Sequence, residues 1–210
     1  MTYDAVIFDL DGTLVDSEAV THAAGVAAFA ACGIAIDPGF LLTLVGVDDA
    51  TSAGRIMVAY PALDIGAFER EWRAASIRGL ARGVPLKAGV TELLSMFVQP
   101  RAIATSSTRE QATRKFAASA LPPFAHVVTV DDVARPKPAP DPFMLAARLL
   151  GVDPARCLAF EDSDTGAQSA YAAGMTVVQI PDMIRTDGRF AHHVAPDILA
   201  GARAAGLIAG

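Results

Sequence analysis

Residues 8–18 read FDLDGTLVDSE, and they continue directly from the apolar run at residues 5–8. An uninterrupted apolar run rich in β-formers is typical of a strand that is buried on both faces. Asp9 and Asp11 therefore stand where this strand ends, and Gly12 permits a sharp turn after them. An isolated Asp-Gly pair is usually no more than a turn signal. Other motifs along the chain are needed to distinguish a reactive pair of aspartates from an ordinary turn.

Four further apolar runs follow, and helical-looking stretches separate them. The predicted strands cover residues 3–9, 101–105, 126–130, 157–161 and 175–180. Strands that alternate with helices predict a parallel α/β sheet. One of the helices is expected to begin with Asp141 as its N-cap, ahead of Pro142 at the first helical position.

Between residues 16 and 84 the pattern changes, and no strand is predicted. Alanine-rich stretches with helical spacing, broken at Gly33, Pro38 and Pro61, indicate successive helices. A crossover between two strands needs far fewer residues than this. We therefore expect a discontinuous α/β core formed by residues 1–15 and 85–210, with a helical cap inserted at residues 16–84.

Three more segments place reactive side chains at or near predicted strand ends. Thr105, Ser106 and Ser107 follow the second strand, and such hydroxyls together with helix N-terminal amides can bind phosphate oxygens. Lys137 stands between two prolines, which restrict the backbone and so fix where the lysine points. Glu161 and Asp162 end the fourth strand.

Ligand sites of open α/β sheets assemble at the carboxyl ends of the strands. If Glu161 and Asp162 join Asp9 and Asp11 there, four carboxylates share a small region. Raised pKa values or a bound metal ion relieve such repulsion. Mg²⁺ fits, because it prefers oxygen ligands and binds phosphate.

Composition limits the partners of the chain. With 210 residues and 52% hydrophobic residues it can form a substantial core. Its net charge of −6 and the lack of any Lys/Arg-rich run argue against binding to nucleic acid or to anionic membranes. No apolar stretch approaches the ~20 residues of a membrane helix, and no secretory signal is evident. We expect a cytoplasmic protein, either a monomer or a homodimer.

Taken in order, the four motifs resemble the haloacid dehalogenase superfamily, in its branch of phosphatases and β-phosphoglucomutase-like proteins. The resemblance spans essentially the whole chain, through FDLDGTLVDSE at 8–18, ATSS at 104–107, RPKPAPDPF at 135–143 and EDSDTG at 161–166. It implies a Rossmann-like, three-layer α/β/α core whose first strand lies between the strands ending at Thr105 and Glu161. It also implies a cap that closes over a small phosphorylated metabolite.

The resemblance also implies a role for each motif residue. Asp9 would be the nucleophile that forms an aspartyl-phosphate, and Asp11 the general acid and then the base. Mg²⁺ would be held by Asp9, the Asp11 backbone carbonyl and Asp162, with Glu161 as a direct or indirect ligand. Thr105 and Lys137 would bind the phosphoryl oxygens, assisted by Gly12 and Ser106.

Three other activities fit the residues less well. A phosphosugar mutase of the β-phosphoglucomutase type is disfavoured, because its histidine is displaced by one position here, at His22, and the residues after Val45-Gly46 are acidic instead of an arginine. A dehalogenase is disfavoured by Asp11, which such enzymes lack. A non-catalytic phosphate-binding or regulatory module is disfavoured by the complete set of motif residues.

Substrate identity depends on the cap, which carries no diagnostic motif. Candidates for contacting the substrate are Thr21, His22, Arg55 and Arg73. A lone histidine on a helix is more often packed or solvated, and a solvated helix face is the more common reason for arginines such as Arg55 and Arg73. The Ser-Ser pair of the second motif and the Glu-Asp-Ser segment resemble sugar phosphatases. This analogy favours a sugar phosphate.

Overall fold

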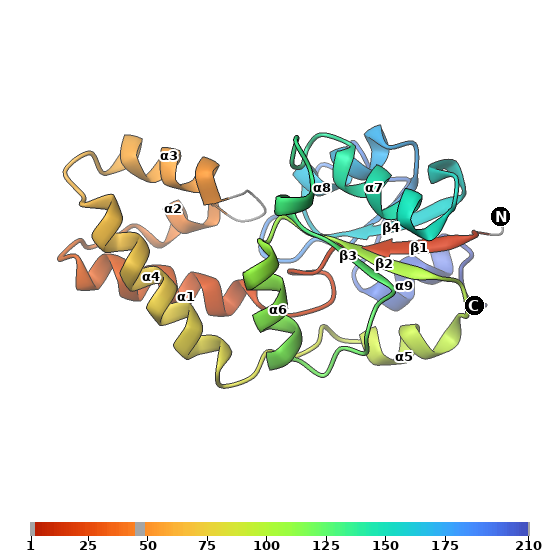
Figure 1. Cartoon of the computed structure of the whole chain (residues 1–210), viewed down its shortest axis with the longest axis horizontal. Helices are drawn as coiled ribbons and strands as arrows, with labels where there is room; N and C mark the ends of the chain where they lie inside the picture. The colour runs from red at the N-terminus through yellow and green to blue at the C-terminus, as the bar shows by residue number, and fades with distance from the viewer. Residues whose placement is uncertain (1–2, 45–48, 210) are drawn as a thin grey trace.

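The protein folds around a six-stranded parallel sheet, seen in a computed structural model that describes residues 3–44 and 49–209 (Figure 1). The strand order is β3-β2-β1-β4-β5-β6, so β1 lies between β2 and β4 as expected. The strands are β1 (Ala5–Phe8), β2 (Arg101–Ala104), β3 (His126–Val128), β4 (Cys157–Glu161), β5 (Thr176–Gln179) and β6 (His193–Val194). The predicted parallel α/β architecture is confirmed.

The predicted strands need corrections. β1, β2 and β5 are one or two residues shorter than predicted at the ends that differ. β3 stops at Val128 instead of residue 130, because the carboxylate of Asp132 accepts hydrogen bonds from the backbone N–H of Thr129 (2.7 Å) and its hydroxyl (2.8 Å). These bonds turn the chain into the 3₁₀ segment η1 (Val130–Asp132). β6 has no counterpart among the predicted strands, since two residues are too few to show a strand period.

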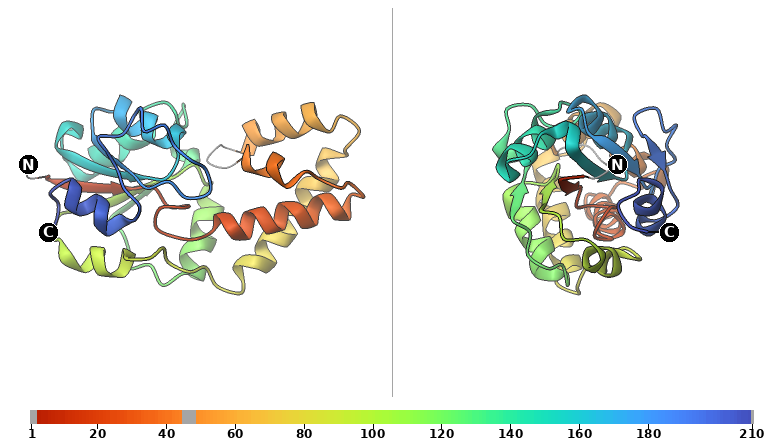
Figure 2. Two further views of the ribbon diagram at one scale, coloured as in Figure 1. Left: turned by 180° about the vertical axis from the view of Figure 1, so that it is seen from behind. Right: turned by 90° about the vertical axis from the view of Figure 1, so that its right-hand side faces the viewer.

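Helices cover both faces of the sheet, which makes the core three-layered (Figure 2). α7 and α8 lie on one face, and α5, α6 and α9 lie on the other. The core helices are α5 (Val90–Met96), α6 (Arg109–Ala118), α7 (Asp141–Leu150), α8 (Asp164–Ala172) and α9 (Ile198–Ala204), with the short 3₁₀ segment η2 (Pro154–Arg156) before β4.

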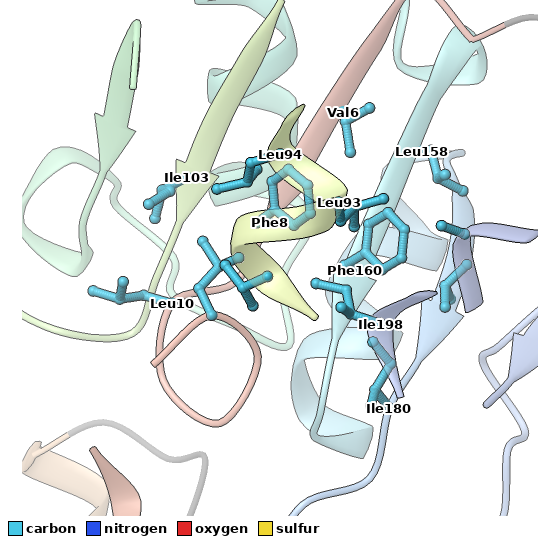
Figure 3. Packing of buried hydrophobic residues seen from close by; sticks show 14 of the residues in the cluster. Val6, Phe8, Leu10, Leu93, Leu94, Ile103, Leu158, Phe160, Ile180 and Ile198 are labelled. Atoms are coloured by element: carbon cyan, nitrogen blue, oxygen red, sulfur yellow. The ribbon is translucent and has the colours of Figure 1, made fainter. Parts of the chain in front are cut away.

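Alternation along β1 explains how one short strand serves both layers. Val6 and Phe8 point into the cluster shared with α5 and α9, whereas Ala5 and Ile7 point into the cluster shared with α7 and α8. The Phe8 ring stacks on Phe160 of β4 at 5.1 Å between centroids (Figure 3). Because all of these positions are fully buried, β1 is fixed from both sides, and so is the loop that follows it.

The start of α7 differs from the prediction. Pro140 occupies the N-cap position, and Asp141 is the first helical residue instead of the cap. The Asp141 carboxylate accepts a hydrogen bond from Arg135 Nε at 3.2 Å, so it is held by a neighbouring side chain and not by the backbone of its own helix.

Four helices lie beyond the carboxyl ends of the strands, and we call them the cap helices (Figure 1). Their core is aromatic, with Phe29 and Phe68 at 4.4 Å and Phe68 and Trp72 at 5.2 Å between ring centroids. The helices are α1 (Glu18–Ala31), α2 (Pro38–Leu42), α3 (Asp49–Ala59) and α4 (Ile65–Leu80). Their arrangement agrees with the predicted helical content of this stretch, while the domain boundaries at residues 16 and 84 stay a prediction.

Two chain crossings connect the cap helices to the core, and the crossings are bonded to each other. The backbone N–H of Asp16 donates to Pro85 at 2.9 Å, and that of Lys87 donates to Leu14 at 3.0 Å. Val15 and Leu86 form an isolated antiparallel bridge. The first crossing therefore leaves the loop of residues 9–15 directly, so the cap helices begin next to Asp9 and Asp11.

Across the described ranges 3–44 and 49–209, no helix is both long enough and apolar enough to cross a membrane.

Candidate active site

The carboxyl ends of three adjacent strands bring the predicted residues together. Asp9 follows β1, Thr105 follows β2 and Glu161 ends β4. The backbone N–H of Asp9 donates to the Phe160 carbonyl at 2.9 Å, which extends the β1–β4 pairing to the aspartate itself. All three side chains are buried, so the sheet fixes their positions before any ligand binds.

Lys137 reaches this point from the loop before α7. Its Nζ lies 2.7 Å from Asp9 Oδ1 and 2.6 Å from Glu161 Oε1, and its side chain is only 2% exposed. The ammonium group also lies 5.0 Å from the centre of the Phe143 ring. Burial lowers the pKa of Lys137, but the two carboxylates outweigh burial and raise it, so the lysine is a fixed positive charge.

Three carboxylates form a compact buried group. Asp9, Glu161 and Asp162 each offer an oxygen within 4.8 Å of the others. Burial raises the pKa values of Asp9 and Asp162 well above their usual range, and repulsion from neighbouring carboxylates adds to the effect. Since Lys137 supplies one positive charge against three carboxylates, the group is short of positive charge. Hard oxygen donors at this spacing fit Mg²⁺.

Glu161 is oriented by the loop that follows it. Its Oε2 accepts from the backbone N–H groups of Asp162 (3.0 Å) and Ser163 (2.9 Å) and from the Ser163 hydroxyl (2.9 Å). Its Oε1 faces Lys137. One oxygen is therefore tied to the backbone, and the other faces the site.

Two glycines make room for the acidic group. Gly12 has φ +77°, and a Cβ there would lie 2.4 Å from Asp162 Oδ2. A Cβ on Gly166 would lie 1.6 Å from Glu161 Oε1. Gly12 is thus placed against a carboxylate, and the phosphate-binding role predicted for it stays a prediction.

Asp11 lies apart from that group and has its own partners. Its Oδ1 accepts from the Ser17 hydroxyl and lies 2.6 Å from Lys115 Nζ. Its Oδ2 accepts from Ser107 Oγ at 2.8 Å and from Thr105 Oγ1 at 3.5 Å. Burial raises the pKa of Asp11, but Lys115 and the hydroxyl donors outweigh burial and lower it. The Asp11 carboxylate is therefore ionised in this structure.

Ser17 and Lys115 were not among the predicted site residues, and Ser107 was predicted only as a hydroxyl that can bind phosphate oxygens. None of the three was expected to contact Asp11. Ser107 and Lys115 are eight residues apart, which corresponds to two i, i+4 steps on one helix face. α6 begins at a capping box formed by Thr108 and Gln111, so its register is marked in the sequence. That register could have placed Lys115 on the same face as Ser107.

The carboxylates lie at the bottom of a cleft of about 550 Å³ between the core and the cap helices. Such a volume lies within the usual range for small-molecule sites. Three of the four specificity candidates, Thr21, His22 and Arg73, line this cleft, as does Ser106. Arg55 does not line it. It donates a hydrogen bond to the Thr43 carbonyl and lines a separate hollow over α2 and α3.

The cap side of the cleft is largely apolar. Phe68 is fully buried, and Trp72 packs edge-on against it. Apolar residues from all four cap helices take part, namely Val20, Leu41, Leu44, Ile56, Ile65, Phe68, Trp72, Ile77 and Leu80. At the rim, Arg73 of α4 pairs with Glu110 of α6, so an ion pair joins the cap helices to the core. Residues 45–48, which carry most of the segment compared with the mutases, lie outside the described residues.

Glu18, at the start of α1, is a further titratable group in the cleft. Burial raises its pKa to about 8, with added repulsion from Asp182, Asp11 and Glu161. Lys87 lowers the pKa of Glu18, but its ammonium group is paired with Asp182 at 2.6 Å. Glu18 is therefore largely protonated at neutral pH.

Comparison with known proteins agrees with this geometry. The family model for haloacid dehalogenase-like hydrolases matches residues 3–174. The chain is 36% identical over 196 residues to protein CbbY of Rhodobacter capsulatus, covering 86% of each protein. It is 32% identical over 182 residues to fructose-1-phosphate phosphatase YqaB of Escherichia coli, covering 85% of this chain and 96% of that protein.

A solved structure matches the whole arrangement. A mutant of CbbY from Rhodobacter sphaeroides, crystallised with xylulose-1,5-bisphosphate, superimposes with a TM-score of 0.78 at 25% identity, covering 93% of this chain and 95% of that one. The chain therefore belongs to the haloacid dehalogenase-like hydrolases, as a phosphatase-type enzyme of the branch that contains sugar phosphatases.

Proposed function

We propose that the protein is a Mg²⁺-dependent phosphohydrolase that removes phosphate from a sugar phosphate through an aspartyl-phosphate on Asp9. The observation that carries the proposal is the buried position of Asp9, between Lys137 at 2.7 Å and the carboxylates of Glu161 and Asp162. The names of two relatives support the substrate class, since one is a fructose-1-phosphate phosphatase and the other was crystallised with a sugar bisphosphate.

In the first step, an oxygen of Asp9 attacks phosphorus and forms a P–O bond while the bond to the leaving oxygen breaks. Asp11 gives its proton to the leaving oxygen, which departs as an alcohol. In the second step, Asp11 takes a proton from water as the water oxygen attacks phosphorus. The acyl-phosphate bond breaks, which frees phosphate and restores Asp9. The lowered pKa of Asp11 corresponds to the base form that the second step requires. The first step starts from the protonated form, which Asp11 regains when it takes the proton from water.

Positive charge and hydrogen-bond donors must offset the repulsion between Asp9 and an anionic phosphate. Lys137 is already held at Asp9, and Thr105 offers a hydroxyl beside Asp11. Asp9, Asp162 and the Asp11 backbone carbonyl would hold Mg²⁺, with Glu161 as a direct or indirect ligand. When bound, the ion supplies charge that stabilises the transferring phosphoryl group.

We further propose that the cap helices form a lid that selects the substrate. Thr21, His22 and Arg73 remain the candidates for contacting the sugar, because they line the cleft opposite the carboxylates. Closure over the carboxylates would exclude bulk water from the reaction.

A phosphate-release screen tests the function. Wild-type protein would be assayed with fructose 1-phosphate, xylulose 1,5-bisphosphate and β-glucose 1-phosphate, with Mg²⁺ and again with EDTA. We expect release from at least one sugar phosphate, its loss in EDTA and its recovery with added Mg²⁺. Isomerisation of β-glucose 1-phosphate without release would support the mutase instead, and release that persists in EDTA would contradict the metal assignment.

A further inference from the structure

Lys115 is a second lysine in the site, partly buried, and none of the four motifs contains it. Its Nζ lies 2.6 Å from Asp11 Oδ1 and 2.7 Å from Ser107 Oγ, and its side chain is 12% exposed. Ser107 Oγ in turn donates to Asp11 Oδ2 at 2.8 Å. The ammonium, the hydroxyl and the carboxylate form a closed triangle, in which Lys115 contacts Asp11 both directly and through Ser107.

The position of Lys115 on α6 explains how it reaches Asp11. Long side chains on a helix point back toward the helix N-terminus. Lys115 lies on the second turn of α6, and Ser107 lies just before the helix begins. The side chain therefore runs back along the helix to the loop at residues 105–107, and the fixed start of α6 fixes the ammonium group.

The carboxylate of Asp11 is held on both of its oxygens by different segments. Ser17 belongs to the first crossing to the cap helices, Thr105 and Ser107 belong to the loop after β2, and Lys115 belongs to α6. Hydroxyl groups rotate easily, whereas the ammonium of Lys115 is a charged donor at the end of a partly buried side chain. Lys115 is therefore the strongest of the contacts that orient Asp11.

We propose that Lys115 is a positioning residue, which orients the Asp11 carboxylate toward the leaving oxygen of the substrate. The inference rests on the proposed function, because it assumes that Asp11 exchanges a proton with that oxygen. Lys115 itself takes no part in the bond changes. It holds the carboxylate that does, and a displacement of about 1 Å at such a group is enough to slow catalysis strongly.

Two substrates with different leaving groups test this role. Lys115→Met removes the ammonium and keeps the aliphatic chain, and Lys115→Arg keeps the charge. Arg148→Met is the control, because it removes an exposed charge from α7, and Arg148 is not among the residues that line the cleft. Values of kcat/KM would be measured for fructose 1-phosphate, or for the phosphosugar that the wild type hydrolyses fastest, and for p-nitrophenyl phosphate.

We expect kcat/KM of Lys115→Met to fall at least about 10-fold on the phosphosugar, because its alkoxide needs the proton of Asp11. On p-nitrophenyl phosphate we expect a fall of less than about 3-fold, because an aryl oxide leaves without a proton. Lys115→Arg should recover part of the loss, and Arg148→Met should match the wild type. A purely structural defect would lower kcat/KM equally for both substrates, and that outcome would overturn the proposal.

Binding separates positioning from direct contact with the sugar. Affinity for the same phosphosugar would be measured by calorimetry in the Asp9→Asn background, with and without Lys115→Met. We expect the Kd to change less than about 2-fold, whereas a loss of 10-fold or more would make Lys115 a substrate ligand and contradict the proposal. Phosphate release that persists in Asp9→Asn itself would contradict the proposed function and not the role of Lys115.

Discussion

The floor of the cleft is a buried group of charges, formed by Asp9, Lys137, Glu161 and Asp162, whereas the roof, formed by the cap helices, is built mainly from apolar side chains. On the floor, Lys137 stands within 2.7 Å of both Asp9 and Glu161, and all three are buried. In the roof, Phe68 and Trp72 pack edge to face, and the charge of Arg73 lies at the exposed rim. The floor therefore holds the groups that the proposed phosphoryl transfer needs, while the roof contributes packed apolar surface.

Removal of the lysine from the floor should have one of the two largest effects on the free energy of unfolding. Lys137→Met leaves Asp9, Glu161 and Asp162 without a cation, and breaking a buried pair in this way costs about 3–5 kcal/mol of unfolding free energy. Lys87→Met is the matched control, because the Lys87–Asp182 pair is more exposed, with side chains 26% and 18% accessible. Urea denaturation without metal measures the free energy of unfolding of both variants. Equal losses for Lys137→Met and Lys87→Met would show that the deeper burial of Lys137 does not make it more important for stability.

Truncation in the roof should cost stability through packing alone. Phe68 is fully buried between Phe29 and Trp72, so Phe68→Ala is expected to lower the unfolding free energy by about 3–5 kcal/mol. Phe68→Leu should cost clearly less. Urea denaturation of the two variants provides the measurement, and a loss under about 1 kcal/mol for Phe68→Ala would mean that the roof is not a packed core.

Glu18 joins floor and roof, and it should make stability depend on pH. Burial and the nearby charges of Asp182, Asp11 and Glu161, partly offset by Lys87, raise its pKa from 4.5 to about 8. Between these values the unfolded chain loses a proton that the folded protein keeps. The contribution of Glu18 to the free energy of unfolding is therefore fully present below pH 4.5. It is lost as pH rises toward 8, by at most about 1.4 kcal/mol per pH unit.

Glu18→Gln should remove that component. Asp9 and Asp162 also have raised pKa values and act in the same direction, so both proteins lose stability as pH rises. The difference between the wild type and Glu18→Gln isolates residue 18. Denaturation at pH 5, 6, 7 and 8 measures it, and parallel curves for the two proteins would show that Glu18 does not titrate in this range.

The rim ion pair should have the smallest effect. Arg73 and Glu110 are 61% and 52% exposed, and such pairs contribute less than about 1 kcal/mol. Arg73→Ala should change the urea midpoint only slightly, and added salt should narrow the difference further. A loss above about 2 kcal/mol would show that the rim holds the cap helices to the core more firmly than its exposure suggests.

The floor was predictable because its groups follow strand patterns. Asp9 comes directly after β1, Glu161 ends β4 and Asp162 follows it, so an apolar run locates each of them. Parallel strands then bring the three to one edge of the sheet. Lys137 lies on a loop, but the flanking prolines marked it as a fixed residue.

The contacts around Asp11 were not predictable in the same way. Lys115 reaches Asp11 only because α6 begins at a particular residue and the side chain runs back along the helix. Side chains of the roof are harder still to place from the sequence. The direction in which Thr21, His22 and Arg73 point depends on how the cap helices pack on one another. Arg55 shows the limit, because a residue with the same charge on α3 lies outside the cleft.

The central claim is that Asp9 is the nucleophile, and one comparison tests it directly. Phosphate release from the preferred phosphosugar with Mg²⁺ would be measured for the wild type, for Asp9→Asn and for Asp4→Asn. Asp4 is a matched control, because it pairs with Arg156 at the surface, away from the cleft. We expect Asp9→Asn to melt cooperatively but to lose at least about 1,000-fold in kcat, while Asp4→Asn keeps its activity. Turnover of a folded Asp9→Asn protein within about 10-fold of the wild type would contradict the account.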